Sequence, residues 1–225
     1  MPLEVRINRR LAEETVLFIS IINWFTLAAV IGILSGFSTT DFLKWLAWSI
    51  NNGTQYPHFL LLPFALFISR LPIQYLAPEA EGQGTDRVIE AIHKHLGRIR
   101  PIVIPVKLVA TVVTIAAGGS AGKIGPCAQI GGGLASFFAE IFRFGDSDRK
   151  KLVIYGISAG FASVFGTPIA GAIFGVGVLF VGSILYEILL PSFVAGMVSF
   201  QVASSKGLAF RCFSSGPRPV LFMDR

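Results

Sequence analysis

Residues 118–126 read GGSAGKIGP and place one lysine between glycines, a pattern that occurs in two kinds of anion site. A nucleotide phosphate loop has the form G-x-x-x-x-G-K-[ST], in which the residue after the lysine supplies a hydroxyl for magnesium. Here the required first glycine falls on Ala117, and the hydroxyl position is Ile124. The pattern therefore disfavours a phosphate loop and leaves an anion site at the start of a membrane helix as the alternative.

That alternative has a clear physical basis. The segment GKIGP ends an apolar stretch and begins a predicted helix, and Pro126 suits the first turn of a helix. The first N–H groups of a helix have no partner within it, and they lie at the positive end of its dipole, so they can hold an anion. A second glycine-rich helix start, EGQGTD at 81–86, has a similar design. Two such starts inside a membrane would make a shared anion path.

The elements that must hold such a site are strongly apolar. The chain has 225 residues, of which 53% are hydrophobic and only 14% charged, and its mean hydropathy is +0.68. Soluble domains carry about a quarter charged residues, so the composition predicts an integral membrane protein. The net charge of +6 comes from short basic clusters between apolar runs, so nucleic acid is not expected as a partner. Cys127 and Cys212 lie far apart, and neither a disulfide framework nor a metal site is predicted.

The apolar runs predict helices. A first span is expected at 16–36 and a second at 58–76, joined by a segment whose Trp45, Trp48 and Tyr56 suit a membrane interface. The elements expected after them are a polar segment with a short helix from Asp86 (77–100), an apolar element (101–117), a helix (127–145), a charged loop (146–151) and an apolar block broken at Gly166-Thr167-Pro168 (152–200). Broken helices at membrane depth line a cavity or are buried in protein, which favours a channel or transporter.

Basic residues gather in three clusters, at 1–14, 78–107 and 143–151, with only Lys44 in 38–57. Two predicted crossings separate each cluster from the next, so all three are expected on one side. The tendency of cytoplasmic loops to be positive makes that side the cytoplasm, and the cell membrane is the expected location. Residues 1–15 are then a cytoplasmic N-terminal segment, and 16–205 form the transmembrane part.

Four segments resemble the CLC chloride channel and transporter family in order, spacing and length: LAPEAEGQGTDRVIEAI, PVK, GGSAGKIGPCAQIGGGLA and GFASVFGTPIAGAIFGVGVLFVG. The resemblance covers about residues 76–200, and GKIGPCAQIGG, which is similar to the family's GREGP-x-x-QIGG segment, is its most specific piece. It implies an all-α integral membrane fold with broken and re-entrant helices, of which this chain is the first half of an inverted repeat. It also implies a homodimer that moves chloride or another small anion across a lipid bilayer.

The resemblance assigns four anion-binding residues. Lys123, Ile124 and Gly125 would present backbone amides in the outer part of the path, and Gln83 would face its centre. In the family a serine hydroxyl stands at the position of Gln83, whose amide can still donate a hydrogen bond. Two other interpretations stay open: Lys123 as a side chain that reaches the membrane interface, and Gln83 as a helix cap.

The proton-carrying residues of the family have no counterpart here. The family's gating glutamate is replaced by Ile124, and the region that carries an acid in its exchangers has Gly177 and Val178. None of these side chains can hold a proton. The resemblance and the chemistry together imply a passive anion channel subunit, or a fragment of one, rather than a proton-coupled exchanger.

The end of the chain departs from this pattern. Residues 206–225 are polar and basic, contain prolines, and have the character of a frameshifted or otherwise foreign tail. The second half of the family's fold has no counterpart. The competing hypothesis is therefore a membrane fragment that conducts nothing, or a membrane-embedded assembly or interaction protein. No nucleophile–base pair stands out, so an enzyme is not expected, and no cofactor is predicted.

Overall fold

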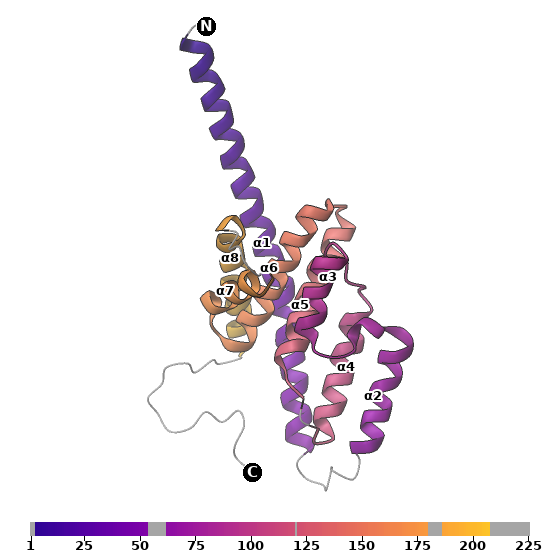
Figure 1. Ribbon diagram of the computed structural model, residues 1–225. Coiled ribbons are helices and arrows are strands. Elements are labelled where there is room, and N and C mark those ends of the chain that lie inside the picture. The colour runs from indigo at the N-terminus through magenta and orange to yellow at the C-terminus, as the bar shows by residue number, and fades with distance from the viewer. Residues whose placement is uncertain (1–2, 54–61, 120, 180–185, 208–225) are drawn as a thin grey trace.

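The computed structural model describes residues 3–53, 62–119, 121–179 and 186–207, and Figure 1 shows them as a bundle of helices from which the start of α1 projects. No strand occurs in these ranges. The elements are α1 (Leu3–Gly53), α2 (Leu62–Leu76), the 3-10 helix η2 (Pro78–Ala80), α3 (Gly84–Lys94), α4 (Val103–Ala116), α5 (Ile124–Ile141), α6 (Asp146–Phe165), α7 (Pro168–Leu179) and α8 (Tyr186–Ser205). The prediction of an all-α fold is confirmed.

Helix α1 continues through the point at which the sequence predicted an end to the first span. The expectation of a connecting segment from 38 is wrong, because α1 runs on to Gly53. Trp45 and Trp48 are therefore exposed positions of a helix, and Tyr56 lies outside the described residues. Gly36 resembles a helix terminator in the sequence, but it is a packing residue: a Cβ there would lie 3.0 Å from Cα and Oγ of Ser199 on α8.

Among the residues that the structure describes, two helices have the length and apolar character to cross a membrane, at Phe18–Ile50 and Glu187–Ser205. The first has 33 residues, which at 1.5 Å per residue is about 50 Å, more than the ~30 Å hydrocarbon core. The predicted crossings at 58–76 and 101–117 are shorter than expected, since their helices are Leu62–Leu76 and Val103–Ala116. Short apolar helices of this kind agree with the broken-helix architecture expected for the membrane part.

The apolar block after residue 152 is interrupted where the sequence predicted. Helix α6 ends at Phe165, Gly166 closes it in the left-handed conformation with φ 68°, and α7 begins at Pro168. The expected charged loop at 146–151 is wrong, because these residues are the first turns of α6. Two aspartates in the first turn, Asp146 and Asp148, suit the positive end of the helix dipole, so the charges start the helix instead of interrupting it.

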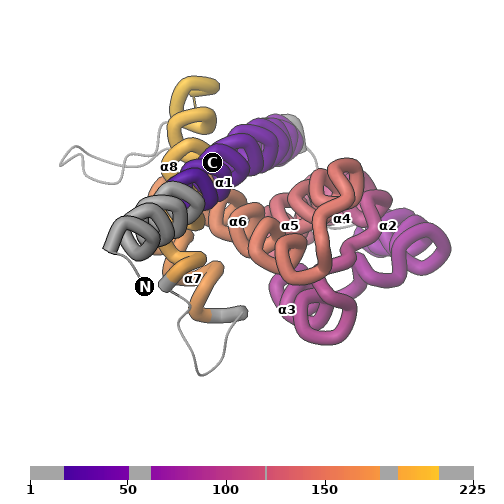
Figure 2. Tube along the Cα trace, turned by 90° about the horizontal axis from the view of Figure 1, so that it is seen from above, coloured from indigo at the N-terminus to yellow at the C-terminus, as the bar shows by residue number. Residues whose placement is uncertain are grey.

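Helix α6 is the centre of the molecule, since every residue from Leu152 to Val164 is buried. Figure 2 shows α5 and α6 between one group formed by α1, α7 and α8 and another formed by α2, α3 and α4. Contacts with neighbours on several sides explain why this part of the sequence is apolar without a helical period. Large apolar side chains on α1 and α2 instead face outward, for example Phe18 (66% exposed) and Phe64 (71%), as lipid-facing residues would.

Two of the three basic clusters, at 1–14 and 143–151, lie towards one end of the fold. Figure 1 shows the start of α1 and the α5–α6 turn at the top, opposite the end where α1 stops and α2 begins. This arrangement agrees with the predicted placement of the clusters on a common side. The side of the membrane that this end of the fold faces remains a prediction.

Candidate anion site

The starts of α3 and α5 meet backbone to backbone. A Cβ on Gly84 would overlap the carbonyl oxygen of Gly125, and a Cβ on Gly125 would lie 3.0 Å from the amide nitrogen of Gly84. Glycine is needed at both positions, because any side chain would push the helices apart. Two helix N-termini that are far apart in the sequence are thus brought to one place, which we call the α3–α5 junction.

The first amides of both helices precede the intrahelical hydrogen bonds. The earliest bonds run from Arg87 N to Gln83 O and from Cys127 N to Lys123 O, each 3.3 Å long. The side chain of Gln83 does not bond to α3 in the described structure, so the interpretation of Gln83 as a side-chain cap is wrong. Lys123, the N-cap residue of α5, has only donor groups on its side chain and cannot accept from an amide.

The four predicted site residues all lie at or next to this junction. Gln83 directly precedes Gly84 and is exposed, and Gly125 is half-buried against it. Lys123 is half-buried, and Ile124 is the first residue of α5 with 39% of its surface exposed. Contact of any of them with an anion remains a prediction.

A buried lysine fixes the turn that leads into α3. Lys107 on α4 is only 8% exposed, and its Nζ donates to the carbonyl oxygens of Ala80 and Gly82, both at 2.8 Å. Gly82 needs its glycine here because its φ is +79°. The ammonium neutralises two carbonyl dipoles and orients the chain immediately before Gln83. Lys107 is therefore the residue that positions the α3 start.

Gln129 supports the same turn from α5. Its Nε2 donates to Glu79 O at 3.0 Å, while its Oε1 is buried and has no partner among the described residues. Sequence reasoning noted Lys107 only as one of several basic residues and Gln129 only as part of a motif. A single lysine within an apolar helix was the available signal, because such a charge must find a partner when it is buried.

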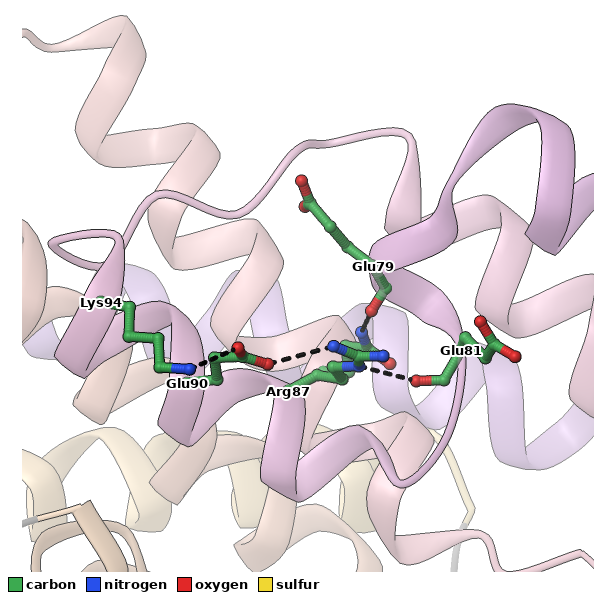
Figure 3. A network of polar contacts seen from close by, with 6 residues as sticks. Glu79, Glu81, Arg87, Glu90 and Lys94 are labelled. Atoms are coloured by element: carbon green, nitrogen blue, oxygen red, sulfur yellow. Dashed lines mark hydrogen bonds and ion pairs between the residues drawn. The ribbon is translucent and has the colours of Figure 1, made fainter.

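The outer face of α3 carries a chain of ion pairs, shown in Figure 3. Arg87 donates from Nε to Glu81 O at 3.0 Å and from Nη1 to Glu90 Oε2 at 3.1 Å, and Lys94 Nζ lies 3.1 Å from Glu90 Oε1. Hydrogen bonding to Lys94, and then to Arg87, holds the pKa of Glu90 below its usual value of 4.5. These contacts tie the turn before α3 to the body of the helix.

Helix α5 packs closely on α6. Each of Gly131 and Gly156 would place a Cβ into the carbonyl of the other, and a Cβ on Gly160 would lie 2.6 Å from Cys127 O. Gly131, the second residue after Gln129, thus serves packing. Small residues allow two helix backbones to approach this closely. The α5 start is therefore rigid.

Chemically, the junction offers backbone donors from two helix starts. The amides at 84–86 and 124–125 and the two dipole ends create a positive potential. Pro126 has no N–H, and Ile124 supplies no titratable group at the junction. Such an arrangement can hold a small anion reversibly by several weak contacts, as conduction requires.

A comparison with protein families matches residues 64–217 of the chain to the family described as voltage gated chloride channel. The match starts earlier and ends later than the 76–200 range on which the sequence motifs rest. It includes the α3–α5 junction and all four predicted site residues.

Among curated proteins, the chain is 36% identical over 200 residues to a "Chloride/fluoride channel protein" of Pseudomonas syringae pv. tomato, covering 88% of this chain and 44% of that protein. It is 29% identical to the "H(+)/Cl(-) exchange transporter ClcA" of Salmonella arizonae, covering 96% of this chain and 46% of that one. The chain thus spans slightly less than half the length of these relatives.

Among solved structures, the fold is similar to "a CLC-type fluoride/proton antiporter", with a TM-score of 0.77, 28% identity, and coverage of 85% of this chain and 49% of the other. A cyanobacterial Cl-/H+ antiporter structure matches with a TM-score of 0.66 at 23% identity, which bears on the fold alone. The fold of the membrane part is therefore the fold of these transporters over about half of their length.

Proposed function

Because the chain belongs to the voltage gated chloride channel family, we propose that it is an integral membrane anion-transport subunit, or a part of one. The observation that carries the proposal is the backbone contact of Gly84 with Gly125, which brings two helix N-termini together. Chloride is the first candidate anion. Gln83 and the amides of Lys123, Ile124 and Gly125 would hold it at the α3–α5 junction.

We further propose that transport is passive. The position of the gating glutamate is Ile124, and the second proton station falls at Gly177 and Val178. An isoleucine cannot take up and release a proton in step with an anion. The relatives described as exchangers make proton coupling the competing possibility, so the test must measure both ions.

The test is flux from liposomes loaded with potassium chloride, with external chloride and pH recorded together. One arm contains the 225-residue chain alone, and a second contains it co-expressed with the part of the Pseudomonas syringae relative that it does not match. Chloride efflux without proton uptake is expected in at least one arm. Proton movement in fixed ratio to chloride would overturn the passive mechanism.

A lack of flux in both arms, with correctly folded protein, would instead favour the hypothesis of a non-conducting membrane or assembly protein. The remaining proposals are a homodimer in the cell membrane and a cytoplasmic N-terminus. The position of the 1–14 and 143–151 clusters towards one end of the fold supports the orientation. Accessibility of cysteines introduced at Lys44 and Arg143 to an impermeant reagent in intact cells would test it, because the two positions should respond oppositely.

A further inference from the structure

An open groove of about 1320 Å³ lies away from the α3–α5 junction, between the segment that joins α3 to α4 and the facing parts of α5 and α6. Charged side chains line it unequally. The cationic residues are Lys94, Arg98, Arg100 and Arg149, and the carboxylates are Glu79 and Glu140. We call this feature the basic groove. Its lining draws on two of the basic clusters, 78–107 and 143–151, which give it a positive potential.

The wall of the basic groove is built and held in place. Ser136 on α5 donates from Oγ to Gly97 O at 2.9 Å and accepts from Ile99 N at 3.0 Å. Gly97, with φ +77°, lies against α6 at ordinary contact distance, since a Cβ there would lie 3.5 Å from Cγ of Arg149. The arginines of the 95–102 segment are therefore presented by a backbone fixed to two helices.

Arg149 is the unusual member of the set. It is only 9% exposed, and one nitrogen, Nη1, pairs with Asp146 Oδ1 at 3.3 Å. Its Nε is buried and has no hydrogen-bond partner among the described residues. A buried guanidinium N–H without a partner is costly, so Arg149 has unused hydrogen-bonding capacity beside the groove that it lines.

The carboxylate of Asp146 does not neutralise both arginines that it contacts in the basic groove. Arg98 Nη2 lies 3.3 Å from the same Oδ1 of Asp146 that pairs with Arg149, so one oxygen serves two guanidinium groups. Arg100 is exposed and takes part in no ion pair within the described ranges. Lys94 is paired with Glu90, so among the described residues Arg100 is the lining cation left without a carboxylate, and Arg98 and Arg149 share one.

We propose that the basic groove binds a phosphate group, carried either by a phospholipid headgroup or by a soluble phosphate. A phosphate has several oxygens and up to two negative charges, and guanidinium groups match its geometry in pairs. Arg149 and Arg98 would bind it from the α6 side and Arg100 from the α3–α4 segment. A halide ion is too small to bridge donors set around a groove of this volume.

The proposal is tested on the purified chain with two probes. Inorganic phosphate is titrated into protein in phosphatidylcholine nanodiscs, with binding followed by calorimetry. Retention of phosphatidylglycerol after detergent extraction is followed by native mass spectrometry. Arg149→Gln and Arg100→Gln are compared with Arg143→Gln, which removes the same charge from the same end of the fold at an exposed position outside the lining.

We expect Arg149→Gln to weaken phosphate binding or lipid retention about tenfold and Arg100→Gln several-fold, with Arg143→Gln unchanged. Loss with phosphatidylglycerol alone identifies a headgroup site, and loss with inorganic phosphate identifies a site for soluble anions. Equal weakening by all three variants would reduce the effect to general surface charge and overturn the proposal, as would absence of binding to both probes. If Arg149→Gln does not fold, the exposed Arg100→Gln carries the same test.

Discussion

The starts of α3 and α5 meet at one point but are held there in opposite ways. Side chains from other elements position the α3 start: Lys107 from α4 and Gln129 from α5 bind the turn before it. The α5 start depends on backbone packing, with Gly131 against Gly156 and Gly125 against Gly84. The α3 start is therefore held by side-chain hydrogen bonds from Lys107 and Gln129, which we call the polar clamp. The α5 start is held by close backbone packing.

The two starts also differ in charge. Helix α3 has an acid, Asp86, in its first turn, whereas α5 has none. A carboxylate in the first turn partly satisfies the positive end of the dipole and competes with a ligand anion. We therefore expect an anion to lie closer to the amides of α5 than to those of α3. Helix α3 is thus positioned by side chains of its neighbours, whereas α5 is expected to supply the main electrostatic attraction for the anion.

The largest effect is expected where the two starts touch. Gly84→Ala places a methyl group into Gly125 O, so the variant should lose about 3 kcal/mol of stability or fail to fold. Thermal unfolding in detergent measures the loss. Gly122→Ala is the matched control, because a Cβ there meets nothing within 4 Å. Equal stability of the two variants would mean that the starts do not meet as described.

Next in size is removal of the polar clamp. Lys107→Met leaves the Ala80 and Gly82 carbonyls without their donor and should cost about 2–3 kcal/mol, because charge-assisted hydrogen bonds are strong and buried acceptors need partners. Gln129→Leu removes one neutral hydrogen bond and a buried oxygen that has no partner, so about 1 kcal/mol is expected.

Denaturant unfolding ranks the two variants, with Lys44→Met as the control for loss of an exposed lysine. If Gln129→Leu costs as much as Lys107→Met, the α3 start depends on packing as the α5 start does, and the contrast between them fails.

A moderate effect on transport is expected at the α5 start. Ile124→Glu places a titratable carboxylate beside the anion path, where it competes for the amides when ionised and releases them when protonated. Chloride flux should therefore rise about tenfold as the pH falls through the pKa of the introduced carboxyl. Ile124→Gln, which is similar in size but does not titrate, should show no such dependence. The same pH response in both variants would contradict the placement of Ile124 at the path.

The smallest effect is expected on the outer face of α3. Its pairs with Lys94 and Arg87 hold the pKa of Glu90 below 4.5, so they stabilise the fold above that pH and are lost as the pH falls through the lower folded-state pKa. Glu90→Gln should be slightly less stable than the unchanged protein at about pH 7, and this difference should shrink as the pH is lowered from 4.5 towards about 3. Melting temperatures at both values test this. A difference that persists in acid would mean that Glu90 acts through packing.

Several features of this protein can be predicted from short stretches of its sequence. Apolar runs predict helices, the Gly166–Pro168 stretch predicts a break, and glycine-rich turns predict the two helix starts, because backbone freedom and hydrophobicity act over a few residues. The same reasoning failed at Gly36 and at 146–151. Helix α1 does not end at Gly36, which instead packs on Ser199, 163 positions away in the chain. The charged residues at 146–151, which were expected to form a loop, are the first turns of α6.

The sequence by itself therefore determined the membrane class, the family and the positions that can begin a helix. Only the tertiary structure decided that Gly84 lies against Gly125, that Lys107 binds the turn before α3, and that the buried Arg149 lines the basic groove. The physical reason is that these contacts join residues far apart in the chain. Their energies depend on packing and desolvation, which no local pattern records.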